Sequence, residues 1–453
     1  MSAPTSFGIE LRRRRDAAGL SLSELAKRVH YSKGHLSKVE SGRKPASAEL
    51  ARLCDAELSA DGKLIELLHA APPGNDMDTR TDMDTRTDSD NLLDDETWVI
   101  GLGRDGGYFA PVSGSAPTVN DTAAALGMIF DGRLRADTDT ALGLFLSRFD
   151  KARALGQVTG AGAVFPLVLM EAKTLQALAE HAPPDEKGVL LQLAARYTEF
   201  AGWMAQEAGD DRMSWWLTKK AVSLADSAGD RRLRAYSLIR RADITLHQDD
   251  ALSTIELAIR AQQHAQVSVR ISGLAAQREA QGHALTGDHT ACLRAIERSA
   301  ILLTEAATGV QDGPALGTVH TPDLVTLTEG WCLHELGRPA RAAEILDLGI
   351  ARFPPGALRA RVRYEARAAL AYATAGELER SCELVVSLLG PARILDSATI
   401  RYDLRRLYKV LVRWRSQPAV RTLLPTLITL LQIHPRLTAA TPAANLLSTP
   451  NAE

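Results

Sequence analysis

Between residues 7 and 70 the chain alternates short amphipathic segments with polar turns. Five segments repeat apolar residues at intervals of three and four, which predicts five short helices. The second segment begins with Ser21 and carries Glu24 three positions later, the spacing of a capping box. The third segment is different, because Leu36 and Val39 are its only obvious core residues. We therefore expect that helix to present a polar and basic outer face.

From residue 120 to residue 440 the pattern is again helical, with turn-like positions at nearly even intervals. These positions are Gly209, Gln248, Gly287, Gly337 and Gly376. Five residues after each of these turn positions stands a small residue: Ser214, Ser253, Cys292, Ala342 and Ser381. Two antiparallel helices need small side chains where their backbones cross closely. The spacing therefore predicts a linear array of helix pairs that bury a continuous core.

The second and third segments of the head form two short helices joined by a tight connection, the helix-turn-helix arrangement. The stretch "LSLSELAKRVHYSKGHLSKVESGRK" resembles the phage-repressor (Cro/lambda-repressor or XRE) family. The shared features are the apolar positions, Ala26 where the helices approach closely, and the ending Ser37-x-x-Glu40-x-Gly42. The resemblance implies that the third helix lies in the major groove, where base edges offer donors and acceptors.

The same resemblance assigns DNA contacts to the third helix, to the loop after it and to the start of the second helix. The residues are Ser32, Lys33, Gly34, His35, Ser37, Lys38, Arg43, Lys44 and Ser23. Some of the arginines at 12–15 are further candidates for phosphate contacts. Many relatives carry glutamine where this chain has Leu22, so a serine hydroxyl or a backbone N–H is expected to contact the phosphate here. For each single side chain, the alternative is a solvated residue without a DNA contact.

The helical array resembles the tetratricopeptide (TPR) class, with a longer repeat and without most of the usual aromatic and proline positions. In that register, the first helix of each pair lines a concave surface. Eight residues of those helices are the candidates for effector binding: Arg196, Glu199, Trp203, Gln206, Gln281, Trp331, His334 and Arg363. The two tryptophans are equally compatible with a core position and with a ligand platform. Solvation is an alternative for each of the charged and polar members.

Charge divides the chain locally, although the net charge is only −2. Residues 1–44 contain ten lysines and arginines against four acidic residues, whereas 71–96 contain two against nine. The hexapeptide DMDTRT occurs twice in tandem in the acidic segment, which has no apolar periodicity and is expected to be a flexible linker.

Gly101, Gly103 and Gly106 then fit the G-x-G-x-x-G pattern. No helix is predicted directly after them, so a dinucleotide site is rejected in favour of a short extended segment.

Composition narrows the functional class. The 453 residues are 45% hydrophobic and 5% aromatic, which favours helix. The four cysteines lack the spacing of a zinc site, so no metal or cofactor is expected, and we expect them to be core residues in a reducing compartment. No signal peptide or long apolar run is evident, so a cytoplasmic protein without a membrane partner is expected. No nucleophile elbow, P-loop or HExxH motif is present, so we expect no enzymatic activity.

The sequence thus predicts an all-α protein with five regions. These are a helix-turn-helix domain (1–70), an acidic linker (71–96), an irregular connection (97–119), a TPR-like α-solenoid (120–440) and a disordered tail (441–453). This layout resembles actinobacterial transcriptional regulators and, more distantly, peptide-pheromone-responsive regulators. The peptide receptors use asparagine on their inner helices, and the predicted repeats contain none between 121 and 440.

The resemblance implies a homodimer that binds a double-stranded DNA operator, associates with the nucleoid and senses an effector. The effector is a peptide, a small molecule or a protein. The alternative is an interaction scaffold that its head recruits to DNA. The operator, the regulated genes and the sign of regulation stay open.

Overall fold

The structure is a computed structural model. It describes residues 7–29, 31, 33–42, 44, 46–58, 60, 62–70, 97–103, 106–112, 138–264, 267–308 and 316–432. The chain divides into two compact units. The first unit combines residues 1–73 with 229–433, and the second combines 74–228 with 434–453. The predicted linker at 71–96 and the predicted tail at 441–453 lie outside the described residues, as do residues 113–137.

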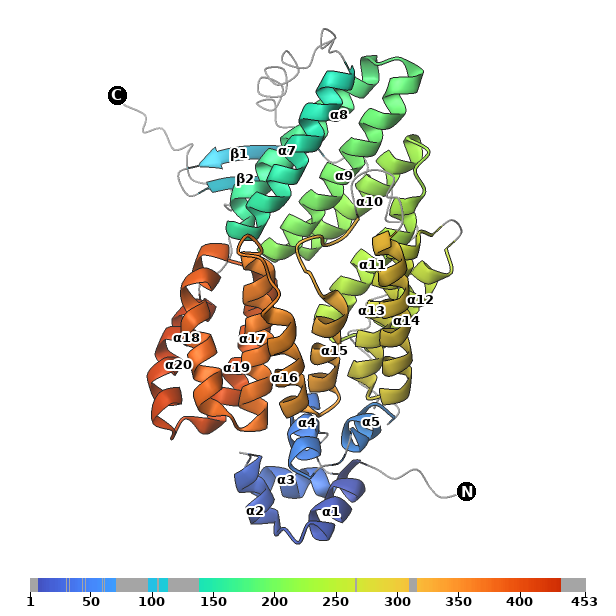
Figure 1. Cartoon of the computed structure of the whole chain (residues 1–453). Helices are drawn as coiled ribbons and strands as arrows, with labels where there is room; N and C mark the ends of the chain where they lie inside the picture. The colour runs from blue at the N-terminus through green and yellow to red at the C-terminus, as the bar shows by residue number, and fades with distance from the viewer. Residues whose placement is uncertain are drawn as a thin grey trace, which may run out of the picture. The chain divides into compact units, whose positions relative to one another are not determined.

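The head of the first unit contains the five predicted helices (Figure 1). They are α1 (Phe7–Ala17), α2 (Leu22–Arg28), α3 (Lys33–Glu40), α4 (Ala48–Glu57) and α5 (Lys63–Ala70). The capping box is confirmed: the Ser21 hydroxyl accepts from the Glu24 N–H at 3.2 Å, and the Glu24 carboxylate accepts from the Ser21 N–H at 2.7 Å. Leucines from all five helices meet in one core: Leu11, Leu25, Leu36, Leu50 and Leu64.

The rest of the first unit is a succession of helices. They are α11 (Arg232–His247), α12 (Ala251–Gln262), α13 (Val269–Thr286), α14 (His289–Thr308), α15 (Leu324–Glu335), α16 (Pro339–Ile350), α17 (Leu358–Ala375), α18 (Leu378–Leu395), α19 (Ala398–Leu411), the 3₁₀ helix η2 (Val412–Trp414) and α20 (Pro418–Gln432). Neighbours along the chain pack together as far as α18, which packs on α20 as well as on α17. The first helix of each pair also packs on the first helix of the next. We call this layer of α11, α13, α15, α17 and α19, together with η2 directly after α19, the inner layer.

The predicted turns are present at the ends of inner helices. Gly287 and Gly376 end α13 and α17 with φ of 79° and 89°, and Gly337 follows α15 with φ of 76°. Glycine suits these positions because it adopts the left-handed conformation without strain from a Cβ atom. At the turn after α11, Asp249 takes the left-handed conformation one residue after Gln248.

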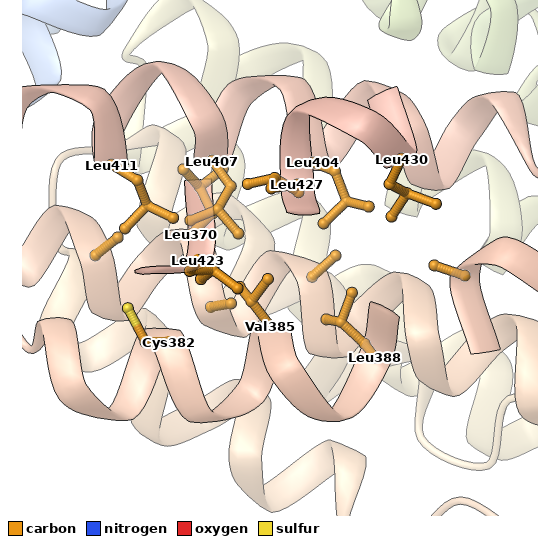
Figure 2. Close-up of a cluster of buried hydrophobic side chains, with 14 of the residues drawn as sticks. Leu370, Cys382, Val385, Leu388, Leu404, Leu407, Leu411, Leu423, Leu427 and Leu430 are labelled. Carbon is orange, nitrogen blue, oxygen red and sulfur yellow. The ribbon is translucent and has the colours of Figure 1, made fainter. Parts of the chain in front are cut away.

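Small residues allow the two helices of a pair to pack closely. A Cβ atom on Gly330 of α15 would lie 2.7 Å from the Cγ of Leu346 on α16. In the next pair, the Ser381 hydroxyl of α18 donates to the carbonyl of Ala369 on α17 at 2.8 Å. Figure 2 shows the leucine-rich core that α17 to α20 form at the end of the array, with Leu370, Leu404 and Leu427 among its members.

The described residues of the second unit form a β-hairpin and four helices. Strands β1 (Thr97–Gly103) and β2 (Gly106–Val112) are antiparallel, and β2 contacts α8. The helices are α7 (Thr138–Val158), α8 (Ala161–His181), α9 (Pro184–Ala208) and α10 (Asp211–Ser227). The glycine-rich motif is thus followed by a strand and not by a helix, in agreement with the rejection of a dinucleotide site. Apart from this hairpin, the regular elements of the described residues are helices.

Helix α8 is long and apolar enough to cross a membrane by length and composition. Its apolar side chains are largely used in packing, since Val164, Val168 and Leu175 are fully buried and α8 packs along α9. This is the pattern of a core helix. The turn predicted after α9 is also present, because Gly209 ends that helix with φ of 89°.

Candidate nucleic-acid interface

Helix α3 separates its side chains cleanly into a buried and an exposed set. Leu36 and Val39 are buried in the head at 0% and 2% exposure. Four predicted DNA-contacting residues are exposed on the same helix: Lys33, Gly34, Ser37 and Lys38. We call these four residues the reading face of α3. The head also packs on the inner layer, and their exposure means that this packing does not cover the reading face. The surface carries hydroxyl and ammonium groups suited to base edges and phosphates.

His35 is placed differently from the other α3 candidates. Its ring is half-buried and lies 5.0 Å from the ring of Tyr31, measured between centroids, at a tilt of 56°. Burial lowers the pKa of His35, and the nearby ammonium groups of Lys44 and Lys38 lower it further. The imidazole is therefore a neutral group near pH 7. It donates or accepts one hydrogen bond at each nitrogen without adding charge to the face.

The remaining DNA candidates are distributed as follows. Lys44 and Ser23 are exposed, whereas Ser32 and Arg43 lie outside the described residues. In the arginine run, the guanidinium of Arg12 is 69% exposed, but that of Arg15 is 9% exposed and pairs with Glu40. Arg15 also donates to the carbonyl of Leu20 at 2.8 Å. Arg15 is therefore a structural residue and the phosphate-contact hypothesis does not apply to it.

Two contacts between the head and the inner layer were not anticipated from the sequence. In the first, Arg413 of η2 donates to the Tyr31 hydroxyl at 2.7 Å, and its guanidinium carbon lies 4.5 Å from the centre of the Tyr31 ring. Tyr31 lies in the turn between α2 and α3. No local sequence pattern marks a contact between residues 382 positions apart.

The second contact is a buried charge cluster around Glu335, at the end of α15. Glu335 is 0% exposed and pairs with Arg52 of α4 and with Arg406 of α19, the latter at 2.6 Å. Burial alone would raise the pKa of this carboxyl, but the charges of Arg406 and Arg52 reverse the effect and lower it well below the usual range. We call Glu335, Arg52, Arg406 and the adjacent His334 the Glu335 cluster.

The four effector candidates of the first unit all lie on the inner layer. Gln281, Trp331 and His334 are buried, and Arg363 is half-buried. His334 contacts Glu335 at 3.3 Å and the hydroxyl of Thr374 at 3.3 Å. The Trp331 ring lies 5.8 Å from the guanidinium carbon of Arg367. These residues are therefore engaged with neighbouring side chains and are not simply solvated.

Arg363 belongs to a second polar group, which connects α11, α17 and α19. It donates to Nε2 of His247 at 2.7 Å, while Nδ1 of His247 lies 2.6 Å from the carbonyl oxygen of Asp243. Burial, followed by the charge of Arg363, lowers the pKa of His247 to about 4. The imidazole is thus neutral, with its proton on Nδ1. Asp403 adds ion pairs to Arg367 at 2.9 Å and to Arg363 at 3.8 Å.

The other four effector candidates belong to α9 of the second unit. Arg196 and Gln206 are buried at 3% and 5% exposure, while Glu199 and Trp203 are half-buried. The Trp203 ring lies 5.5 Å from the ring of Phe200. Within this unit the candidates therefore line the packed side of a core helix. The structure divides the eight residues between two units, four in each.

Comparison with known families identifies the head. Residues 6–68 match the helix-turn-helix domain family. The head is therefore a helix-turn-helix domain. The match supports a DNA-binding regulator. It covers α1 to α4 and α5 as far as residue 68, and therefore includes the exposed face of α3. No curated protein and no solved structure matches the chain.

Proposed function

We propose that this protein is a sequence-specific, DNA-binding transcriptional regulator of the XRE type. The observation that carries the proposal is the exposed face of α3, where Lys33, Ser37 and Lys38 lie together opposite the buried Leu36 and Val39. An α-helix of this kind fits the major groove of B-DNA, where its outward side chains reach base edges.

Gly34 gives independent support. Glycine within a helix costs up to about 1 kcal/mol relative to alanine. Many glycines of this chain are required by close packing: a Cβ atom on Gly8 of α1 would lie 2.4 Å from the Val39 carbonyl oxygen. At Gly34, by contrast, a Cβ atom would meet nothing within 4 Å. Packing within the chain thus leaves room for a partner to approach the start of α3 closely, and a DNA strand is the partner that we propose.

Groups around α3 would supply the contacts to phosphate. Lys44 lies just beyond the helix, and the Ser23 hydroxyl lies in the first turn of α2; both are exposed. Arg12 adds an exposed guanidinium on α1. Such contacts release counterions from the DNA, so we expect the binding constant K to fall steeply as the salt concentration rises. The logarithm of K should decrease by roughly 0.9 per unit of log salt concentration for each phosphate contacted.

The proposal for the helical part is that it is TPR-like, dimerises and senses an effector. The inner layer supports a stacked repeat, because successive first helices pack on each other and end in the predicted turns. The polar groups around Glu335 and Asp403 connect helices that are distant in sequence. A peptide, small-molecule or protein effector that binds near them would change how these helices pack, and through dimer geometry the spacing of two heads. The role is regulatory and cytoplasmic, without catalysis.

The DNA-binding proposal is tested by selecting bound sequences from random DNA with the full-length protein. Affinity for the selected site is then measured for Lys33→Ala, Lys38→Ala and a control, Lys63→Ala. Lys63 is an exposed lysine of the same head, on α5 and outside the reading face. We expect the α3 variants to lose about tenfold or more in affinity, the equivalent of 1–3 kcal/mol per good contact, and the control to change little. Equal affinity of all three variants would contradict the proposal.

Sedimentation of the free protein and of its DNA complex tests dimerisation. A single copy per DNA site at all concentrations would rule the dimer out. Purification from the native host tests the effector hypothesis against the scaffold alternative. A bound small molecule or peptide that shifts DNA affinity supports effector sensing. A stoichiometric protein that leaves DNA affinity unchanged indicates a scaffold.

A further inference from the structure

The head of the first unit is held against the inner layer at three places. The first place involves two repeat-turn glycines. A Cβ atom on Gly337, after α15, would lie 2.9 Å from the Cβ of Asp55. A Cβ atom on Gly287, after α13, would lie 2.6 Å from the backbone nitrogen of Glu66. Gly376 ends α17 at the same phase of the repeat, and a Cβ atom there would meet nothing within 4 Å. Two turns of the array are thus in close contact with α4 and α5.

The second place is the Glu335 cluster. Arg52 extends from α4 to a carboxylate that is fully buried and also paired with Arg406 of α19. A buried carboxylate is strongly stabilised by such partners, and removing one of them is costly because the charge that remains is left without full compensation. The pair therefore favours one position of α4 against α15.

The third place is next to the reading face itself. Arg413 holds the Tyr31 ring from one side, and the His35 ring of α3 lies 5.0 Å from the centre of the Tyr31 ring. A guanidinium at 4.5 Å from an aromatic centre makes a cation–π contact, here combined with a hydrogen bond to the hydroxyl. Through Tyr31 the last helices of the array thus contact the turn that sets the direction of α3.

We propose that Arg413, acting through Tyr31, and Arg52, acting through Glu335, are positioning residues for DNA recognition. They fix the head to the inner layer, so the helical domain determines how α3 is presented. The docked head is competent to bind, because Lys33, Gly34, Ser37 and Lys38 are all exposed in it. This inference rests on the proposed DNA-binding function. A displacement of α15, α19 or η2 by an effector would reach the head through these contacts.

The test combines a structural readout without DNA and an affinity readout. For the structural one, spin labels are placed on Arg12→Cys in the head and Arg341→Cys on α16, where the parent side chains are 69% and 60% exposed. The four native cysteines are buried. Pulsed electron paramagnetic resonance should give one narrow distance distribution. We expect it to broaden in Arg413→Ala and in Arg52→Gln. The control is Arg28→Gln. Among the described residues Arg28 pairs with Glu57 of the same head, at 2.8 Å, so its loss should leave the distance distribution unchanged.

For the affinity readout, the same substitutions are made without labels. If the docked orientation falls to a tenth of the population, apparent affinity for the selected site falls about tenfold. Affinity for random DNA at low salt should stay within about twofold, because non-specific binding depends on phosphate contacts and not on a fixed head. Arg413→Lys keeps a cation over the ring and should restore most of the specific affinity. Gly337→Ala should lower the specific affinity as Arg413→Ala does. Gly376→Ala introduces a similar strain, because both glycines have positive φ, but Gly376 does not contact the head and its replacement should leave the specific affinity unchanged.

The outcomes separate this inference from the proposed function. No specific DNA binding by the unmodified protein, with distance changes as expected, would refute the function and with it the positioning role. Broadened distances with unchanged or stronger specific affinity would overturn the positioning role and leave the function intact. Unchanged distances in both Arg413→Ala and Arg52→Gln would overturn the inference directly. Parallel losses of specific and random DNA affinity would point to general unfolding of the head, and would also overturn it.

Discussion

The guanidinium of Arg15 on α1 binds the carboxylate of Glu40 on α3 through two hydrogen bonds, from Nε to Oε1 at 2.7 Å and from Nη2 to Oε2 at 3.0 Å. Each side chain is 9% exposed. The pair joins the first helix to the end of the third and explains why an acidic residue occupies position 40 in an otherwise basic segment. It also separates Arg15 from Arg12, whose exposed side chain remains a candidate for phosphate binding.

Replacing Arg15 with alanine should loosen α3 strongly. The change leaves the Glu40 carboxylate buried without its partner, which costs roughly 2–5 kcal/mol. Native-state hydrogen exchange of the α3 amides measures the effect as a lower opening free energy. Arg12→Ala is the matched control: Arg12 pairs with Asp16 at 3.8 Å in an exposed position, so it should change the same quantity by less than about 1 kcal/mol. Similar values for the two variants would refute the structural role of Arg15.

Gly34→Ala should separate stability from DNA binding. The added methyl group meets no neighbour within 4 Å, and alanine favours helix over glycine by up to about 1 kcal/mol, so the head should become slightly more stable. Affinity for the selected DNA site should nevertheless fall about tenfold or more, because the methyl group occupies space that the DNA needs. Thermal unfolding and fluorescence anisotropy measure the two effects. A variant that is more stable and binds as well as the unmodified protein would exclude close approach at this position.

Glu279 should make the array sensitive to acid. This side chain of α13 accepts hydrogen bonds from Gln262 of α12 and from Arg298 of α14, both at 2.6 Å. Burial raises its pKa, but the hydrogen bonds from His283, Gln262 and Arg298 outweigh burial and lower the pKa to about 2 from an ordinary value of 4.5. The ionised form is therefore favoured in the folded state. Its contribution to the free energy of unfolding is complete above pH 4.5 and is lost as the pH falls towards 2.

The measurement is the free energy of unfolding of the unmodified protein and of Glu279→Gln across that pH range. The difference between the two should be largest above pH 4.5 and should shrink towards pH 2. Comparing the two proteins cancels the other carboxyl groups that titrate in the same range. A difference that is independent of pH would mean that Glu279 has no depressed pKa.

Gly330→Ala should destabilise the helical array. Its new Cβ atom would lie 2.7 Å from the Leu346 Cγ and 3.3 Å from the Leu346 backbone nitrogen, so α15 and α16 would have to separate. Overpacking of this kind costs about 1–3 kcal/mol. Gly390→Ala on α18 is the control, because a Cβ atom there meets nothing within 4 Å. Chemical denaturation measures both. A stabilised Gly330→Ala variant would show that a glycine at this position is not needed for the packing of α15 on α16.

Local signals in the sequence were sufficient for many elements. The Ser21 capping box, the leucine periodicity and the turn glycines predict helix positions because each depends on atoms only a few residues apart. The family resemblance further identified α3 as the face with exposed Lys33 and Lys38. The sequence did not show which arginines at 12–15 are available for phosphate, since a basic residue in a basic run carries no sign of a distant partner such as Glu40. The hairpin at 97–112 was anticipated only as an extended segment.

The sequence by itself determined the kind of head, the succession of helices and the turns that close them, because backbone conformation and amphipathic periodicity are encoded locally. Only the tertiary structure decided where the head is held. Tyr31 meets Arg413 across 382 positions, and Arg52 meets Glu335 across most of the array. Such pairings depend on how successive helices stack, and small rotations at each packing contact accumulate along the array. No pattern within a single helix records these accumulated rotations. The contacts that hold the head, and with it α3, against the inner layer were therefore visible only in the tertiary structure.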